Sequence, residues 1–224
     1  ANSEIYIVPA SGGEPYNVSR HPDFDELPVW SPDGKRLAWA SHRQDNSFDV
    51  WAVWLTDADD RRTNADWLKV WNGGDEPEED EAEEGGDDDE DADDEDNGED
   101  LPEVVIDFDR LWRRGEQLTS MNGDQFPVAI GPDGKRIVFL SQAEDETDLY
   151  SVRFDGEEVE RLTEGDTGPD VVQLIDDSTL FFLNSGGSIQ RIDLDGSSGD
   201  PVPFKARYTV DTRIEREVVY DEVW

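Results

Sequence analysis

Short alternating apolar runs separated by polar turns dominate the chain, and one pair of such runs occurs twice. Residues 28–41 read PVWSPDGKRLAWAS, and residues 127–141 read PVAIGPDGKRIVFLS. The shared PDGKR block lies between two apolar segments in both copies. Proline sets φ early in a tight turn and glycine adopts a positive φ, so each block predicts a β-hairpin.

The second half of the unit also recurs. Each hairpin is followed by a polar stretch, an aromatic-rich segment, a turn containing glycine and one further short strand. The aromatic segments are 48–53 (FDVWAV) and 147–152 (TDLYSV), with copies at 3–8 (SEIYIV) and 188–192 (SIQRI). A weaker hairpin lies at 171–183, 43 residues after the second copy. Four strands in a period of this length are typical of a β-propeller blade.

The repeats predict an all-β fold made of four-stranded antiparallel blades, in a partial ring of about three and a half blades. We expect a propeller segment over 1–204, with a half blade at 1–18 and blades at 27–119, 126–163 and 170–204. An open arc exposes strand edges, so we expect the chain to be part of a longer protein. Residues 205–224 are expected to be a linker and the start of a helical domain, because apolar positions there follow a helical spacing.

An acidic insertion interrupts the second of these units. Residues 75–100 include 19 Asp or Glu and no Lys or Arg. Such a segment cannot bury enough apolar surface to offset the entropy of ordering, so we predict a disordered insertion over 56–103. It is expected to separate a third strand at 51–55 from a fourth strand that begins at Val104. The apolar residues before the acidic run either dock on the blade edge or form a short helix; these are Trp67, Leu68, Val70 and Trp71.

The composition excludes several kinds of site. The chain has no Cys, so disulfides, zinc–thiolate sites and cysteine nucleophiles are excluded, and with only two His residues it argues against a histidine-based centre. We expect no cofactor and no metal. The formal net charge is −39, which argues against a nucleic-acid partner. Because the excess extends beyond the acidic segment, it favours adaptation to high salt over a single acidic interaction loop.

No residue presents a recognisable catalytic arrangement. Ser31, Ser41 and Ser141 are interpreted as hydroxyls that satisfy backbone groups near turns. The aromatic residues that alternate on the predicted strands are interpreted as core between blades; these are Trp30, Trp39, Trp51, Trp54 and Phe139. Arg113 and Arg114 form a basic pair in an acidic protein, so they are the candidate substrate contacts, for instance with a peptide carboxylate, or they pair with neighbouring Asp.

These motifs resemble a known family. The phrase at 28–43 followed by FDVWAV resembles the TolB-type, WD-like propeller repeat, which also occurs in prolyl-oligopeptidase relatives and tricorn-type proteases. Residues 104–119 (VVIDFDRLWRRGEQLT) resemble a tricorn strand that follows an acidic insertion, and YDEVW at 220–224 resembles the junction to a helical domain. The resemblance implies a non-catalytic propeller segment of a tricorn-like serine peptidase that degrades oligopeptides, with the propeller as a substrate filter or channel.

The resemblance also implies partners and a location. Peptide substrates and the helical, PDZ and hydrolase domains of the same polypeptide would be the partners, in the cytoplasm, with no membrane contact and with homo-oligomerisation left open. The alternative is a TolB-like interaction propeller without catalysis, which would be periplasmic. A third reading, a prolyl-oligopeptidase-type propeller, would require an α/β-hydrolase with a G-x-S-x-G motif downstream. The family's catalytic His and Ser fall outside this sequence, so no residue here inherits a catalytic role.

Overall fold

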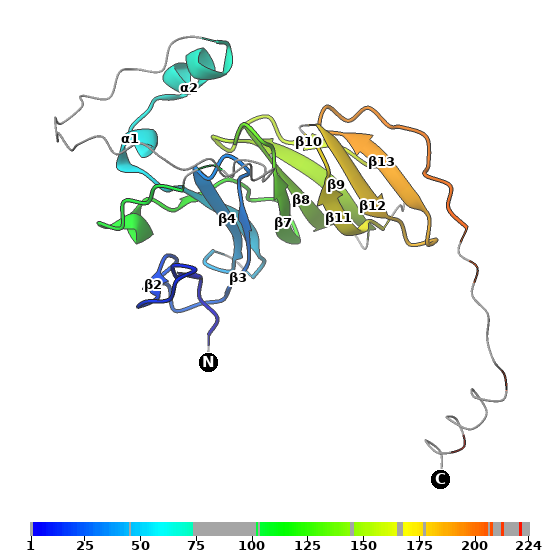
Figure 1. Cartoon of the computed structure of the whole chain (residues 1–224), viewed down its shortest axis with the longest axis horizontal. Helices are drawn as coiled ribbons and strands as arrows, with labels where there is room; N and C mark the ends of the chain where they lie inside the picture. Colours follow the sequence, from blue (N-terminus) through cyan, green and yellow to red (C-terminus); the bar gives the residue numbers. More distant parts are fainter. Residues whose placement is uncertain are drawn as a thin grey trace, which may run out of the picture.

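Four antiparallel sheets follow one another along the chain and lie side by side in space (Figure 1). The computed structural model describes residues 2–44, 46–73, 102, 104–143, 146–164, 168–176, 178–205, 207, 212 and 220. We call the sheets the hairpin sheet, the first full blade, the second full blade and the end sheet. The hairpin sheet contains β1 (Tyr6–Ile7) and β2 (Tyr16–Asn17). The first full blade contains β3 (Asp25–Trp30), β4 (Arg36–Ser41), β5 (Asp49–Trp54) and β6 (Glu116–Gln117).

The second full blade repeats this order, and the end sheet repeats its first three strands. The second full blade contains β7 (Asp124–Ile130), β8 (Arg136–Ala143), β9 (Glu146–Arg153) and β10 (Glu160–Arg161). The end sheet contains β11 (Asp170–Leu174), β12 (Thr179–Leu183) and β13 (Ile189–Asp193), and its fourth strand is reduced to an isolated bridge between Ile189 and Val202. The predicted fold class, a partial β-propeller of antiparallel blades, is confirmed.

The two PDGKR blocks form the predicted hairpin turns. The amide of Gly34 donates to the carbonyl of Ser31 at 3.0 Å, and the amide of Gly134 donates to that of Gly131 at 2.9 Å. Both glycines have a positive φ, 71° and 69°. In each turn the Asp carboxylate accepts from the amide of the following Lys, at 3.1 Å for Asp33 and 3.0 Å for Asp133. The repeated sequence therefore produces a repeated backbone geometry.

The hydrophobic core lies between neighbouring sheets rather than inside one of them. Each cluster takes side chains from the facing sides of two sheets, as in stacked blades. Between the full blades it includes Ala38, Val50, Ala52, Leu118, Ile130, Ile137, Phe139 and Val152. Between the hairpin sheet and the first full blade it includes Ile5, Val18, Leu37, Trp39, Val53, Leu55 and Leu111. Each blade is therefore stabilised mainly by its neighbours.

A polar clasp closes the outer strand of three sheets in the same way. A hydroxyl accepts a backbone N–H at 2.9 Å in each sheet: Ser19 from Ile5, Thr119 from Val50, and Thr163 from Leu149. Two positions before the hydroxyl, a side chain donates to the acidic residue that precedes that N–H. These pairs are Asn17 with Glu4, Gln117 with Asp49, and Arg161 with Asp148. The clasp fixes a two-residue outer strand that has few ladder bonds of its own.

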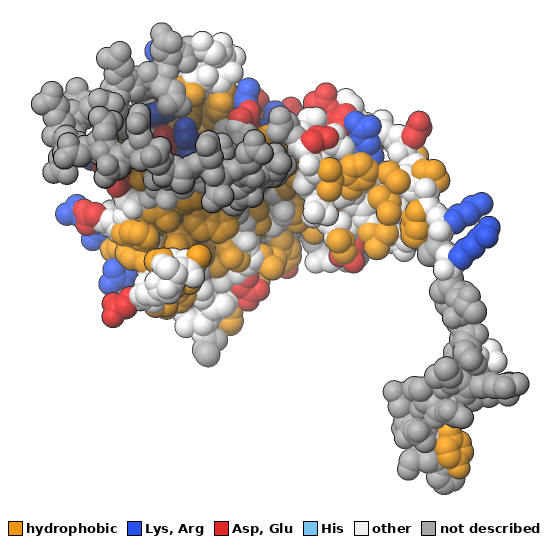
Figure 2. Space-filling model, in the orientation of Figure 1, with side chains coloured by type: hydrophobic (Ala, Val, Ile, Leu, Met, Phe, Trp, Pro, Cys, Tyr) orange, Lys and Arg blue, Asp and Glu red, His pale blue; other side chains and the backbone are white. Residues whose placement is uncertain are grey.

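One face of the end sheet differs from its counterparts. The strand registers align Phe181, Leu183 and Ile189 with Val138, Leu140 and Leu149 of the second full blade. Val138 and Leu149 are fully buried against the end sheet, whereas Phe181, Leu183 and Ile189 remain half-exposed. Hydrophobic side chains accordingly gather over the end sheet in Figure 2. This face has the character of an inter-blade surface.

The prediction of a disordered insertion over 56–103 is wrong for its first part. Residues 57–60 form α1 (Asp57–Asp60) and residues 64–71 form α2 (Asn64–Trp71). Thr63 and Asp66 build a capping box at the start of α2, and Trp67 is buried, so both a cap and burial offset the ordering entropy. The two alternatives considered for this stretch, docking and helix formation, occur together. Residues 74–101 lie outside the described residues.

The fourth strand does not begin at Val104 as predicted. The partner of β5 is β6 (Glu116–Gln117), with Gln117 opposite Trp51. Residues 104–108 are not in a strand, and Leu111 begins a 3-10 turn, η1 (Leu111–Arg113), whose first side chain is buried. The clasp explains why β5 pairs with Glu116–Gln117, because the hydroxyl of Thr119 accepts from the amide of Val50 and so fixes the register of β6. The helix predicted within 205–224 lies almost entirely outside the described residues.

Acid is expected to loosen the start of α2. The hydroxyl of Thr63 donates to the carboxylate of Asp66 at 2.7 Å, and this bond lowers the pKa of Asp66 below the ordinary value of 3.8. A lowered folded-state pKa contributes stability above the unfolded value and loses it as pH falls through the folded value. The amide chemical shift of Thr63 should therefore move with pH below about 4 in NMR spectra. Asp66→Asn should abolish that transition, and a transition that persists in this variant would contradict the assignment.

Candidate functional site

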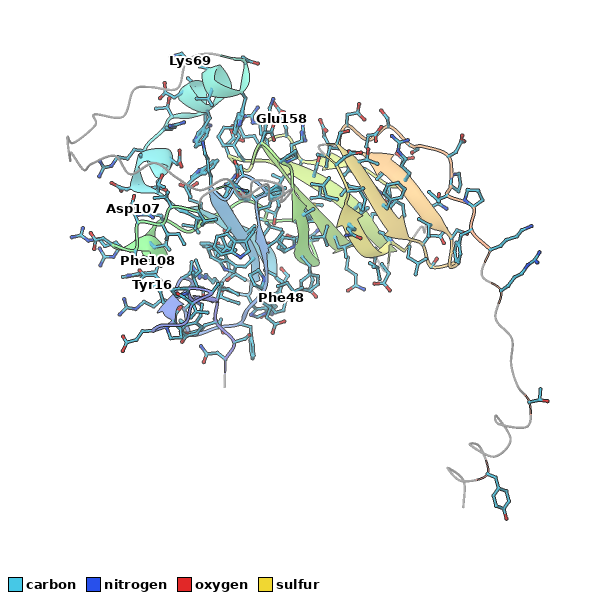
Figure 3. All side chains as sticks on the ribbon, in the orientation of Figure 1. Tyr16, Phe48, Lys69, Asp107, Phe108 and Glu158 are labelled. Carbon is cyan, nitrogen blue, oxygen red and sulfur yellow. The ribbon has the colours of Figure 1, made fainter. Side chains whose placement is uncertain are left out.

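Arg113 and Arg114 lie at the rim of a cavity of about 600 Å³ on the outer side of the first full blade. The loop before β6 forms one wall and α1 forms the other. Figure 3 shows Asp107 and Phe108 of this loop beside Tyr16 of the hairpin sheet, and the Tyr16 and Phe108 rings are 5.0 Å apart. The cavity is lined by Asp57, Asp60, Arg61, Ile106, Asp107, Phe108, Asp109, Arg110, Arg113 and Arg114.

Arg114 holds the wall of the cavity together. Its Nη2 donates to the carbonyls of Leu55 and Asp107, both at 2.9 Å. The amide of Asp107 in turn donates to the carbonyl of Leu55 at 2.9 Å. Because the guanidinium is occupied by main-chain acceptors, Arg114 serves as a positioning residue for the loop.

Arg113 is placed differently, with an exposed side chain. Its guanidinium lies over the ring of Trp112, 4.8 Å from the centroid, and Arg20 lies 5.0 Å from the same centroid. Within the part of the chain that the structure describes, no carboxylate forms an ion pair with Arg113. A guanidinium held by stacking keeps its N–H donors available to a carboxylate. The sequence-predicted pair thus divides into one accessible arginine and one structural arginine.

Carboxylates balance the other cations of the cavity. Asp57 forms an ion pair with Arg61 and its amide donates to Asp107 at 2.8 Å. Burial raises the pKa of Asp60, an effect that the nearby Arg114 opposes. The lining holds as many Arg as Asp side chains, so in a chain of net charge −39 this near-neutral cavity with an accessible guanidinium can accommodate an anionic group.

The three serines singled out in the sequence lie in different surroundings. Ser31 behaves as predicted, because its hydroxyl accepts from the amide of Arg36 at 2.8 Å. The prediction for Ser41 and Ser141 is wrong: both are buried, and among the described residues neither hydroxyl has a hydrogen-bond partner. They lie on β4 and β8 inside the sheet stack rather than at turns. His42 packs edge-on against Phe48 at 5.3 Å and is not bonded to a serine.

The predicted aromatic core is largely in place. Trp39 and Phe139 are buried between sheets, Trp54 is buried against Trp67 of α2, and Trp51 is partly buried. Trp30 departs from the prediction, since 42% of it is exposed on β3. Within the described residues, no group of three His, Asp or Glu side chains is arranged to hold a metal ion. No helix in that part of the chain is long and apolar enough to cross a membrane.

Solved structures with a similar fold are propeller proteins. A TolB protein of Agrobacterium tumefaciens matches with a TM-score of 0.54 and 20% identity over 89% of this chain and 56% of that one. The tricorn protease matches with a TM-score of 0.50 and 13% identity over 89% of this chain and 20% of that one. A puromycin-hydrolysing peptidase of Mycobacterium tuberculosis matches with a TM-score of 0.47, 14% identity, and 88% and 24% coverage.

Sequence comparison adds no family. No protein-family model matches the chain, and no curated protein does. The chain spans about half the length, 56%, of the TolB structure it matches. At these identities the likeness concerns the fold alone, so the chain is a partial β-propeller of the kind found in TolB and in the propeller domains of peptidases.

Proposed function

We propose that this chain is the non-catalytic propeller region of a tricorn-like serine peptidase and that it binds oligopeptides for cleavage elsewhere. The observation that carries the proposal is Arg113, an exposed guanidinium without a carboxylate partner among the described residues, in a cavity lined mainly by Asp and Arg side chains. A guanidinium binds a carboxylate through two parallel N–H bonds. Ile106 and Phe108 provide apolar surface for a terminal side chain.

The proposed ligand is therefore the carboxyl end of a peptide with an apolar terminal residue. Peptidase activity, a filtering or channel role and a cytoplasmic location belong to the same proposal. The fold shared with the tricorn protease supports it, because that structure contains a propeller of this type.

Arg113→Ala is expected to weaken binding of a peptide with a free carboxylate about tenfold or more, as loss of a charge-assisted hydrogen bond does. Isothermal titration of the chain with a short peptide and with its C-terminal amide measures this effect. The amide should bind the unaltered protein as weakly as the acid binds the variant. Equal affinity for acid and amide in the unaltered protein would contradict the proposal.

Two variants serve as controls. Arg20→Ala removes the cation on Trp112 that does not line the cavity, so it should leave peptide affinity unchanged. Arg114→Ala should instead lower the melting temperature by several degrees, because two carbonyls lose their donor. If Arg20→Ala weakens peptide binding as much as Arg113→Ala does, the loss reflects the reduced positive charge of this region and not a specific contact with Arg113.

A second candidate is a TolB-like interaction propeller without catalysis, which would be periplasmic. The match to the Agrobacterium TolB, with its higher TM-score and identity than the tricorn match, favours it. Such a propeller would bind a protein partner rather than a peptide end. The two candidates separate in the titration above, because only the first requires a preference for the free carboxylate.

A further inference from the structure

Helix α2 belongs to the first full blade in sequence but rests on both full blades in space. It comes after β5 and α1 in the chain, and its two tryptophans stack on the tryptophan at the end of β5. The ring of Trp54 at the end of β5 lies 4.2 Å from that of Trp67, and Trp67 lies 5.2 Å from Trp71. The stack ends on Phe154 after β9, whose ring lies 4.6 Å from Trp71 in an edge-on arrangement.

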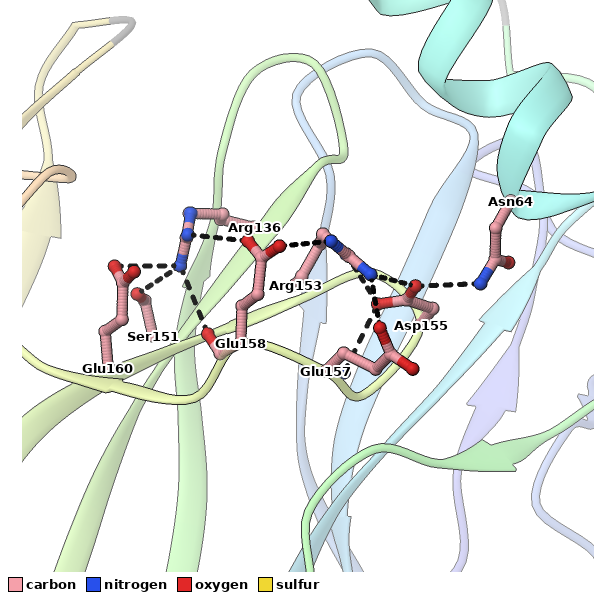
Figure 4. A network of polar contacts seen from close by, with 8 residues as sticks. All are labelled: Asn64, Arg136, Ser151, Arg153, Asp155, Glu157, Glu158 and Glu160. Carbon is pink, nitrogen blue, oxygen red and sulfur yellow. Dashed lines mark hydrogen bonds and ion pairs between the residues drawn. The ribbon is translucent and has the colours of Figure 1, made fainter.

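Two hydrogen bonds tie the same helix to turns of the second full blade. The indole Nε1 of Trp71 donates to the carbonyl of Asp133, in the PDGKR turn, at 2.8 Å. The side-chain amide of Asn64 donates to the carboxylate of Asp155 at 2.8 Å, as Figure 4 shows. That carboxylate is itself held by Arg153 through bonds of 2.8 and 2.7 Å, so its position is fixed.

A buried cation adds a third connection beneath the stack. Arg36 on β4 lies 4.5 Å from the centroid of Trp54, and its Nη2 donates to the carbonyl of Phe154 at 2.6 Å. Burial lowers the pKa of Arg36 to about 10. The contact links the first full blade to the second directly, at the place where α2 crosses.

We propose that α2 is an inter-blade lock, which holds the two full blades as one rigid unit. Apart from α2 and Arg36, the interface between them consists of the apolar cluster around Phe139 and of two hydrogen bonds at Phe48. The backbone amide of Phe48 donates to Asp124 at 2.9 Å, and the backbone amide of Gln125 donates to the carbonyl of Phe48 at 2.7 Å. Apolar burial is not directional, so it holds two sheets together without fixing their relative rotation. The hydrogen bonds from α2 to Asp133 and Asp155 add directional contacts at a second place, so rotation about the Phe48 contacts would break them. The lock is independent of the proposed peptide site.

Hydrogen exchange of the whole chain, followed by mass spectrometry, tests the lock. Trp71→Phe keeps an aromatic ring but removes the indole donor, and Asn64→Ala removes the other hydrogen bond without touching the stack. Each variant should speed exchange severalfold in the turns at 131–137 and 153–157 of the second full blade. Lys69→Ala, on the same helix with a side chain 74% exposed, should leave those turns unchanged.

The outcomes separate clearly. Faster exchange in those turns, with the strands of both blades unchanged, supports the lock. Faster exchange confined to 57–73 shows that α2 merely rests on the surface and overturns it. Equal acceleration at every amide also overturns it, since the helix then contributes only to global stability.

Discussion

Replacing Phe139 by alanine is expected to lower the free energy of unfolding by about 3–5 kcal/mol, the usual cost of removing a buried aromatic ring. Phe139 is fully buried on β8 in the cluster between the two full blades, and its ring stacks on Tyr150 at 5.7 Å. Because this cluster lies between the two full blades, the cavity left by alanine would weaken the packing of one blade against the other. Urea denaturation monitored by circular dichroism measures the change.

Trp30→Ala is the matched control on the exposed side of the propeller. It removes a larger ring, but 42% of Trp30 is exposed, so the expected loss is smaller, about 1–2 kcal/mol. A loss for Phe139→Ala no larger than that of the control would mean that the full blades do not pack through this cluster. An unchanged midpoint with a smaller m-value would point to separate unfolding of the blades.

The hairpins were predictable because their turns are local. Pro, Asp and Gly at fixed offsets specify the turn at 32–36 and again at 132–136, and the alternating residues beside them specify strands. The third hairpin lacks this turn yet has the same architecture. In the first strand of each of these sheets, β3, β7 and β11, the register shifts at the corresponding place. The shifts lie between Glu26 and Val29, between Pro127 and Ala129, and between Asp170 and Gln173. This shared bulge is a backbone feature with no common residue type.

The errors arise where distant residues decide the outcome. Val104 and the residues after it read as a strand by apolar content, but β5 pairs instead with the residues that complete a clasp. The first part of the insertion falls within the predicted disordered segment although Trp67 and Trp71 are apolar, because the sequence does not show that they contact aromatic residues of two blades. At the candidate site, the sequence singled out Arg113 and Arg114, and both line the cavity. It could not show that Arg114 is occupied by the carbonyls of Leu55 and Asp107, because Leu55 is far away along the chain.

Replacing Thr163 by valine is expected to cost about 2–3 kcal/mol of unfolding free energy, although the two side chains have nearly the same shape. The hydroxyl accepts from the amide of Leu149 and donates to the carboxylate of Asp148, both at 2.9 Å in a buried site. Valine leaves that amide without an acceptor, and a buried donor without a partner destabilises the fold by more than a typical hydrogen bond stabilises it. Thr163→Ser keeps the hydroxyl and should cost about 1 kcal/mol or less. A loss for serine with little or none for valine would show that packing of the methyl group, and not the clasp, is what stabilises this position.

The end sheet provides the reciprocal experiment because it lacks the clasp. The amide of Val202 donates to the carbonyl of Ile189 at 3.0 Å, as Leu162 does to Leu149 at 2.8 Å. This alignment puts Pro201 and Pro203 at the two clasp positions and Ser188 at the acidic one. None of the three supplies the missing bonds, which explains why the outer strand shrinks to a bridge at Val202. Ser188→Asp combined with Pro203→Thr should therefore raise the melting temperature and protect the amide of Ile189 from exchange. If the amide stays unprotected, the hydroxyl and the acid alone do not suffice to order this strand.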